Sequence, residues 1–256
     1  MDIVLRRTPS FRLDGKRALV AGASSGIGEG AAMALAEAGA HVTLAARSRD
    51  RLEQLAARLC EAGYTAEAMS LDVQDAEATE RLVEACEPFD ILVNSAGLAR
   101  HGPALETTTS DFDAVVNVNL RGAYFLTRTV ARRLIAAGRP GSLINISSQM
   151  GHVSGVDRAV YSATKHAVEG FTKGMAIEWG RFGIRVNTIC PTFIRTPLAE
   201  TTLRNPDRMK WITDKIKLGR IGEIEDIMGP VVFLASDASA MITGTALLVD
   251  GGWTAG

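Results

Sequence analysis

Tyr161 and Lys165 are the two side chains of this sequence whose types and spacing best fit proton transfer. Four residues apart on a helix, a phenol and an ammonium group lie on the same face. A free phenol has a pKa of about 10, which suits proton exchange at neutral pH poorly, and a neighbouring cation lowers that pKa by stabilising the phenolate. The pair therefore indicates acid–base chemistry, although this spacing alone also arises by chance.

A glycine-rich turn, Gly22-Ala-Ser-Ser-Gly-Ile-Gly28, follows a short apolar run and precedes an alanine-rich segment. It therefore joins a strand to a helix. Glycines let the backbone approach a pyrophosphate closely, and the free N–H groups of the following helix bind its charge. The spacing differs from the common G-x-G-x-x-G pattern, but the position predicts a dinucleotide site. The contacts expected from this turn are Gly22, Ser24, Ser25, Ile27 and Gly28.

The second apolar run ends at Ala46 and is followed by Arg47 and Ser48. In doubly wound folds the end of this strand faces the adenosine ribose, where an acidic side chain binds the ribose hydroxyl of NAD. No acid occurs here before Asp50, and the guanidinium of Arg47 can pair with a phosphate through two hydrogen bonds. The sequence therefore favours NADP as the cofactor, with NAD as the alternative.

These groups must be positioned by a particular order of strands and helices. The expected strands cover 18–21, 41–46, 65–71, 90–94, 142–147, 184–190 and 245–249, and the expected helices 26–38, 50–61, 75–86, 111–137 (as two helices), 159–181 and 223–235. Alternation of this kind predicts an α/β fold, a doubly wound (Rossmann) seven-stranded parallel sheet with helices on both faces. An eight-fold barrel is disfavoured because the last expected element is a strand. We expect one domain over 1–256, with an N-terminal extension at 1–13.

Composition argues against several classes of function. With 28 basic and 29 acidic side chains, the chain has no broad positive surface for nucleic acid. No apolar stretch approaches the ~18 residues of a membrane helix, and the start of the chain does not resemble a signal peptide. Cys60, Cys86 and Cys190 show neither a disulfide framework nor metal-ligand spacing. We expect a cytoplasmic protein that binds a small molecule and no metal, nucleic acid or membrane.

Six short motifs occur in one order along the chain: Gly22–Gly28, Asn94-Ser-Ala-Gly97, Asn117-Val-Asn-Leu120, Ile146-Ser-Ser148, Tyr161 with Lys165, and Pro191–Thr196. In this combination the sequence resembles the short-chain dehydrogenase/reductase family, from about Leu13 to Gly252. The resemblance implies hydride transfer between a nicotinamide cofactor and an alcohol or ketone, and it implies a homotetramer.

The resemblance also implies four catalytic residues. Tyr161 would be the general acid or base at the reacting oxygen, and Ser148 would hydrogen-bond that oxygen. Lys165 would lower the pKa of the phenol and bind the nicotinamide ribose, and Asn119 would hold a water that relays protons to Lys165. Ser147 is the alternative oxygen-binding serine, but strand alternation is expected to point it away from Ser148.

For the cofactor, the resemblance implies adenine contacts at Asp72 and Val73 and further contacts along the cleft. The further contacts are Asn94, Ala96, Gly97, Tyr161, Lys165, Pro191, Ile194 and Thr196. Three residues depart from the usual family pattern, namely Ala21, Ser95 and Thr192. Thr192 stands where the family has glycine after the proline, so we expect a reshaped pocket on the nicotinamide side.

Loops at the carboxyl ends of the expected strands carry polar side chains that we assign to the substrate pocket. They are Arg100, with His101 beside it, Gln149, His152, Arg158 and Arg195. A polar, partly cationic pocket of this kind suits a small secondary alcohol or ketone, such as a sugar, sugar acid or other hydroxy acid. Residues 196–218 lie where the family has a substrate lid.

Two other functions are kept as alternatives. One is reduction of 3-oxoacyl thioesters, the commonest housekeeping activity of the family. It is disfavoured because Phe182 stands where members that bind an acyl-carrier protein often have a basic residue. The other is a catalytically silent dinucleotide sensor. Such a sensor would not require Tyr161 or Lys165, so their joint presence with Ser148 argues against it.

Overall fold

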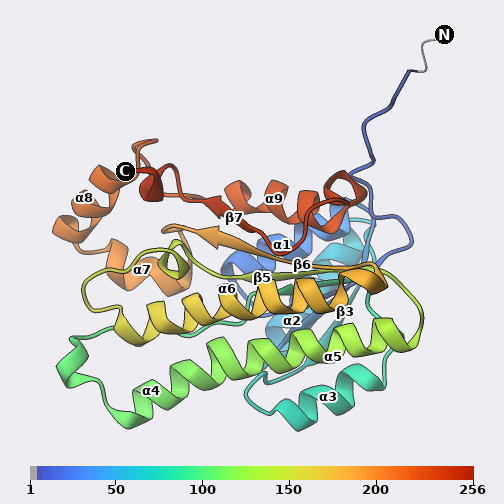
Figure 1. Cartoon of the computed structure of the whole chain (residues 1–256), viewed down its shortest axis with the longest axis horizontal. Helices are drawn as coiled ribbons and strands as arrows, with labels where there is room; N and C mark the ends of the chain where they lie inside the picture. Colours follow the sequence, from blue (N-terminus) through green and yellow to red (C-terminus); the bar gives the residue numbers. More distant parts are fainter. Residues whose placement is uncertain (1–4) are drawn as a thin grey trace.

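The computed structural model describes residues 5–256, which form a parallel sheet of seven strands between two layers of helices (Figure 1). The strands are β1 (Arg17–Ala21), β2 (His41–Ala46), β3 (Ala66–Ser70), β4 (Ile91–Asn94), β5 (Gly141–Ile146), β6 (Ile184–Pro191) and β7 (Ala246–Val249). Their order across the sheet is β3-β2-β1-β4-β5-β6-β7. Successive strands are therefore added toward one edge of the sheet from β1 to β3 and toward the other edge from β4 to β7. The expected doubly wound, seven-stranded Rossmann fold is confirmed.

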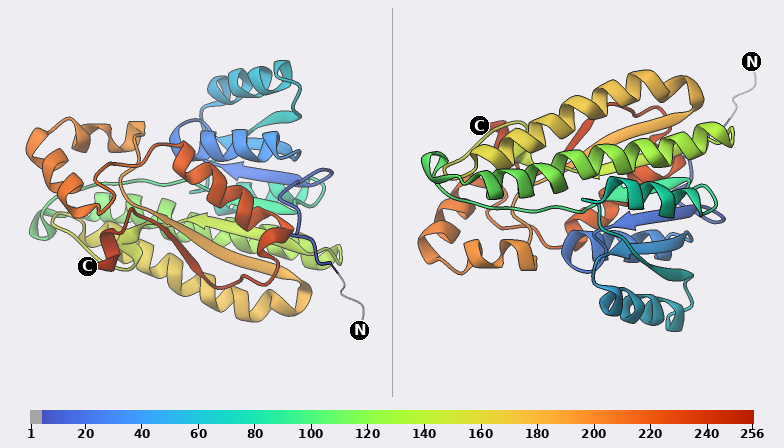
Figure 2. Two further views of the ribbon diagram at one scale, coloured as in Figure 1. Left: turned by 90° about the horizontal axis from the view of Figure 1, so that it is seen from above. Right: turned by 90° about the horizontal axis from the view of Figure 1, so that it is seen from below.

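Helices cover both faces of the sheet (Figure 2). One face carries α1 (Gly26–Glu37), α2 (Arg49–Glu61) and α9 (Glu225–Ala235), and the other carries α3 (Ala76–Glu84), α4 (Thr109–Val116), α5 (Ala123–Ala136) and α6 (Ala159–Trp179). Two short helices, α7 (Pro197–Leu203) and α8 (Pro206–Lys215), lie beyond the carboxyl end of β6. Within residues 5–256, no helix is both long enough and apolar enough to cross a membrane.

The near-continuous apolar runs of the central strands follow from burial on both faces. In β1, Ala18 and Val20 belong to the core under α1 and α9, while Leu19 and Ala21 belong to the core under α5 and α6. All four side chains are fully buried. A strand that alternated apolar and polar residues would therefore leave polar side chains in one of the two cores.

The two helices expected over 111–137 are joined by a π-helical turn at Asn117–Gly122, so that α4 and α5 form one long rod (Figure 1). A π turn inserts one extra residue and locally rotates the side chains that follow. It buries Asn119, which is 1% exposed. Gly122 is required at the end of this turn because a Cβ there would lie 2.6 Å from the carbonyl oxygen of Val73.

Candidate active site

A cleft of about 680 Å³ opens at the carboxyl ends of the strands, where the loops after β1 to β6 meet. It lies at the point where the strand order reverses, which is where doubly wound folds bind their ligands. The glycine turn and Arg47 line one part of the cleft, and Ser148 and Tyr161 line another. The cleft therefore brings together the two groups of residues that the sequence predicts to bind a cofactor and to transfer protons.

The glycine turn fits a pyrophosphate. Gly22 and Gly26 have positive φ angles of 80° and 60°, a conformation that glycine adopts without strain. A Cβ on Gly22 would lie 2.7 Å from the backbone nitrogen of Ala96, so the turn packs directly against the loop after β4. Ser25 precedes α1 but gives it no side-chain cap, and Ser24 to Ile27 line the cleft. The first N–H groups of α1 are thus available to an anion.

Arg47, Ser48, Asp72 and Val73, which we expect to contact the adenosine part of the cofactor, all line the cleft. The side chain of Arg47 is exposed and stands at the entrance of this region. Arg49, two residues further on, instead forms an ion pair of 2.7 Å with Glu53 and does not line the cleft. Arg47 is therefore the guanidinium of this loop that can reach a phosphate on the adenosine ribose.

Tyr161 and Lys165 project from the first turns of α6, beside the end of β5. The ammonium nitrogen of Lys165 lies 5.6 Å from the centre of the Tyr161 ring and donates a hydrogen bond of 2.9 Å to the carbonyl oxygen of Ile146. The hydroxyl of Ser148 accepts a hydrogen bond of 3.1 Å from the backbone N–H of Met150. These contacts hold Lys165 against the end of β5 and hold the Ser148 hydroxyl in the turn that follows β5.

The electrostatics differ from the expectation that Lys165 lowers the pKa of the phenol. Burial raises the pKa of Tyr161 above its usual value, against the opposing effects of a hydrogen bond with Ser148 and the charge of Arg158. Burial also lowers the pKa of Lys165, to about 8, because the ammonium group is largely removed from water. The charge of Arg158 thus favours the phenolate form, while burial opposes it.

The structure gives the two serines different surroundings. The Ser148 hydroxyl accepts a hydrogen bond from the backbone N–H of Met150, whereas the Ser147 hydroxyl is buried with no hydrogen-bond partner among the described residues. Both serines line the cleft. Of the two, Ser148 is the one that acts on the pKa of Tyr161.

Asn119 makes a set of contacts that the sequence analysis missed. Its amide accepts a hydrogen bond of 2.8 Å from the backbone N–H of Leu98, donates one of 2.8 Å to the carbonyl of the same residue, and donates one of 3.3 Å to Thr164. Leu98 follows the Asn94–Gly97 segment, of which Ser95, Ala96 and Gly97 line the cleft. Asn94, expected as a cofactor contact, does not line it, because its buried amide donates a hydrogen bond of 3.1 Å to Asn145 on β5. Asn119 therefore ties the loop after β4 to the catalytic helix α6.

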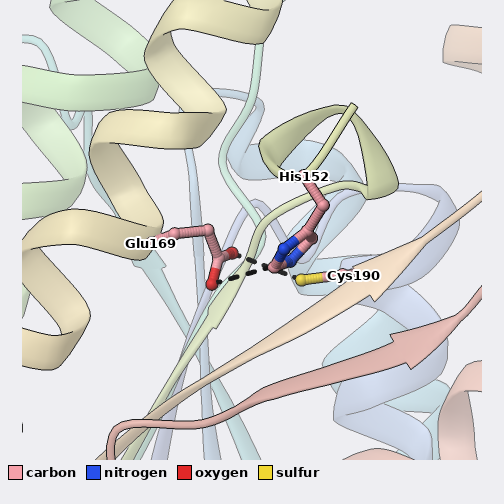
Figure 3. A group of neighbouring side chains, drawn as sticks. All are labelled: His152, Glu169 and Cys190. Carbon is pink, nitrogen blue, oxygen red and sulfur yellow. Dashed lines mark hydrogen bonds and ion pairs between the residues drawn. The ribbon is translucent and has the colours of Figure 1, made fainter. Parts of the chain in front are cut away.

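Figure 3 shows a polar cluster of Glu169, Cys190 and His152, of which Glu169 and Cys190 are buried and His152 is exposed. Glu169, one turn beyond Lys165 on α6, accepts hydrogen bonds of 2.9 Å from Thr188 and 3.3 Å from the thiol of Cys190, and His152 lies 3.9 Å from it. Burial and the charge of Glu169 raise the pKa of Cys190 to about 12. Because the hydrogen bonds within the protein satisfy the carboxylate, the cluster acts as a structural support for the end of β6.

The residues expected to bind the substrate fall into two groups. Gln149, Arg158 and Arg100 line the cleft, although Arg100 also lies 3.7 Å from Asp111 on α4. His152 and Arg195 do not line it. The side chain of His152 joins the cluster behind β6, and that of Arg195 turns outward to form an ion pair of 3.1 Å with Glu223. Position in a loop at the correct end of the sheet does not fix the direction of a side chain.

His101, next to Arg100 in the loop that follows the Asn94–Gly97 motif, also lines the cleft. Its ring packs edge-on against Tyr161, with the ring centres 5.6 Å apart. Burial and the charges of Arg158 and Arg208 lower the pKa of His101 to about 4, so the ring is neutral at neutral pH.

The segment expected as a lid contains α7 and α8, and part of it covers the cleft. Thr196 to Ala199 and Thr202 line the cleft. On α8, the ring of Trp211 packs edge-on against Trp253 near the end of the chain, with the ring centres 5.3 Å apart. Trp253 also contacts Phe193 in the loop after β6. Three aromatic side chains thus hold α8 against the rest of the protein.

Comparison with known proteins agrees with this geometry. The family model described as enoyl-(acyl carrier protein) reductase matches residues 22–254. L-xylulose reductase of Bos taurus is 41% identical to this chain, over 96% of this chain and 99% of that protein. The chain belongs to the short-chain dehydrogenase/reductase family.

Other members of this short-chain dehydrogenase/reductase family share the fold over almost the whole chain. Gluconate 5-dehydrogenase of Gluconobacter oxydans is 38% identical, over 95% of this chain and 96% of that protein. The crystal structure of a gluconate 5-dehydrogenase from Burkholderia cenocepacia, in complex with NADP and tartrate, superposes with a TM-score of 0.93. It is 36% identical in sequence and covers 96% of this chain and 98% of its own.

Proposed function

We propose that this protein is an NADP-dependent oxidoreductase that interconverts a secondary alcohol and a ketone on a small sugar or sugar acid. One observation carries the proposal. The cleft is lined by Ser148, Tyr161 and Lys165 and also by Arg47 and the glycine turn, which leads into a helix without a side-chain cap. The relatives named as L-xylulose reductase and gluconate 5-dehydrogenase support the substrate class, and the NADP in the Burkholderia enzyme supports the cofactor.

The residues of the cleft can perform the proton transfer that such a reaction needs. A bound nicotinamide dinucleotide would supply or accept the hydride. In reduction, the hydroxyl of Tyr161 donates its proton to the substrate oxygen, and in oxidation the phenolate removes it. Ser148 hydrogen-bonds the same oxygen and holds it in place. With a pKa of about 8, Lys165 carries a positive charge at neutral pH, and the charge of Arg158 favours the phenolate form of Tyr161.

The cofactor assignment is tested by Arg47→Ala, with Arg49→Ala as the matched control outside the cleft. A guanidinium hydrogen-bonded to a phosphate contributes about 1.5–3 kcal/mol, which is roughly a 10- to 150-fold change in binding. We expect Arg47→Ala to shift the ratio of kcat/KM for NADP and NAD toward NAD by about that factor, and Arg49→Ala to leave it unchanged. An unshifted ratio for Arg47→Ala would refute the assignment.

The catalytic assignment is tested by Tyr161→Phe, assayed with NADP and NAD against sugars, sugar acids and 3-oxoacyl thioesters. An enzyme of the proposed kind loses most of its turnover while NADPH binding, followed by fluorescence, is retained. A silent sensor shows no turnover in the wild type with any substrate. Wild-type activity restricted to the thioesters would replace the sugar assignment by the acyl-thioester alternative.

We also propose a homotetramer, a cytoplasmic location and a lid function for residues 196–218. Exposed apolar side chains on the α4–α6 face and on β7 support assembly, among them Phe112, Tyr124 and Leu248. The three cysteines are free thiols, in keeping with a reducing compartment. Light scattering coupled to size exclusion tests the assembly, and subcellular fractionation tests the location.

A further inference from the structure

Arg158 and Gln149 are two buried polar side chains that line the cleft beside Tyr161 without satisfying their own hydrogen-bonding groups. Arg158 is 7% exposed, and its Nη1 has no hydrogen-bond partner within residues 5–256. Gln149 is 1% exposed, and neither its amide nitrogen nor its amide oxygen has a partner in the same part of the chain. Buried groups of this kind are rare because each costs free energy when it is left unpaired. Two of them in one cleft point to a polar ligand.

The charges around Arg158 leave its guanidinium without a carboxylate of its own. Asp157, the nearest acidic residue in sequence, lies 3.4 Å from Arg208 of α8, which occupies its carboxylate. Burial and, to a smaller extent, the charge of Arg208 lower the pKa of Arg158. His101 is neutral at neutral pH and adds no charge, and Tyr161 is a protonated phenol there. This part of the cleft is therefore positively charged near the reacting oxygen.

The backbone holds Arg158 in a fixed position relative to the catalytic tyrosine. Asp157 adopts a positive φ of 62°, which is uncommon for a residue other than glycine, and it sets the direction in which the chain enters α6. The carbonyl of Arg158 accepts a hydrogen bond of 2.8 Å from the N–H of Ser162, so Arg158 lies at the start of the helix. Three residues along a helix return to the same face, which places Arg158 beside Tyr161.

We propose that Arg158 is the receptor for a carboxylate on the substrate, with Gln149 binding a neighbouring hydroxyl, so that the enzyme acts on polyhydroxy acids and their keto acids in preference to neutral sugars. This inference rests on the proposed function and narrows it. A planar guanidinium binds a carboxylate through two parallel hydrogen bonds, and the ligand's negative charge offsets the cost of burying the cation. A neutral sugar would leave that cation uncompensated.

The test compares D-gluconate with the neutral polyol xylitol as substrates of the wild type, Arg158→Gln, Arg158→Lys and the control Arg181→Gln. Arg181 is exposed and precedes β6, at the opposite end of the sheet from the cleft. We expect the wild type to prefer gluconate. Arg158→Gln should lower kcat/KM for gluconate by roughly 10- to 150-fold, mainly through KM, with a much smaller loss for xylitol. Arg158→Lys should recover part of the gluconate activity, because it restores the charge but not the two-pronged geometry.

Three results would overturn the inference. The first is an equal loss on gluconate and xylitol, which would show that Arg158 acts on Tyr161 or on packing rather than on substrate charge. The second is a raised KM for NADP in Arg158→Gln, which would assign the guanidinium to the cofactor. The third is a wild-type enzyme that oxidises xylitol and does not oxidise gluconate. This result would refute the preference for acids and would still agree with the proposed oxidoreductase function. Turnover of neither class, with NADPH binding retained, would count instead against the proposed function. Circular dichroism and NADPH affinity report whether each variant is folded.

Discussion

Replacing Asn119 by alanine should destabilise the protein well beyond the loss of one side chain, because that amide joins three parts of the structure. Asn119→Ala removes three hydrogen bonds and leaves the N–H and the carbonyl of Leu98 without partners. An unsatisfied buried group costs about 1–3 kcal/mol, and Leu98 is only partly buried, so water can reach some of its backbone. The expected loss in the free energy of unfolding is therefore about 2–4 kcal/mol. For a chain of this size it corresponds to a fall in Tm of roughly 4–16 °C.

The assay is urea unfolding followed by far-ultraviolet circular dichroism, at matched protein concentrations so that subunit association affects all variants equally. Asn117→Ala is the matched control, since Asn117 lies in the same π turn and its side chain makes no hydrogen bond among the described residues. It should change the unfolding free energy by less than about 1 kcal/mol. If Asn119→Ala unfolds within about 0.5 kcal/mol of the control, Asn119 does not tie the loop after β4 to α6.

Three further changes have outcomes that follow from the contacts described. Asp226→Asn should lower the free energy of unfolding by about 1–2 kcal/mol at pH 7, because the hydrogen bond from Arg220 lowers the pKa of the Asp226 carboxyl to about 2. In acid unfolding curves, the difference from the wild type should disappear as the pH falls from about 4 to 2. Gly28→Ala should lower the unfolding free energy by about 1–3 kcal/mol and weaken NADPH binding, because the added Cβ would lie 2.2 Å from the carbonyl oxygen of Gly22. Gly170→Ala is the control, because a Cβ at Gly170 meets no neighbouring atom, and equal unfolding curves for the two variants would refute the argument. Glu169→Gln should lower the pKa of the Cys190 thiol, seen as earlier thiolate absorbance in a pH titration of protein lacking the other two cysteines, and an unchanged titration would show that burial alone sets it.

The fold could be predicted from the sequence because its strands and its helices each leave a pattern in consecutive residues. Apolar runs of strand length and alanine-rich helical segments alternate without interruption, and burial on two faces leaves the strands apolar throughout. The junction of α4 and α5 could not be predicted in the same way. Nothing in the sequence around Asn117–Gly122 distinguishes a helix break from a π turn, because the turn is stabilised by the close approach of Gly122 to Val73 on a distant segment.

The site was predictable where motifs fix backbone geometry and less so where side-chain direction decides the role. The cleft brings the glycine turn and the Tyr161 pair together as expected. Arg158 and Arg195 looked equivalent in sequence, since both are arginines in loops at the same end of the sheet. One is buried beside the catalytic tyrosine, and the other is turned outward by Glu223, a partner 28 residues away that no local pattern indicates.

The contact between Trp211 and Trp253 gives the protein an optical reporter of its own. Two of the three tryptophans meet where α8 packs against the end of the chain, and the third, Trp179, lies at the far end of α6. A Trp179→Phe variant would emit only from the pair that holds α8 in place. Its fluorescence, recorded as ligand is added, would then follow the movement of α8 in solution without any attached label.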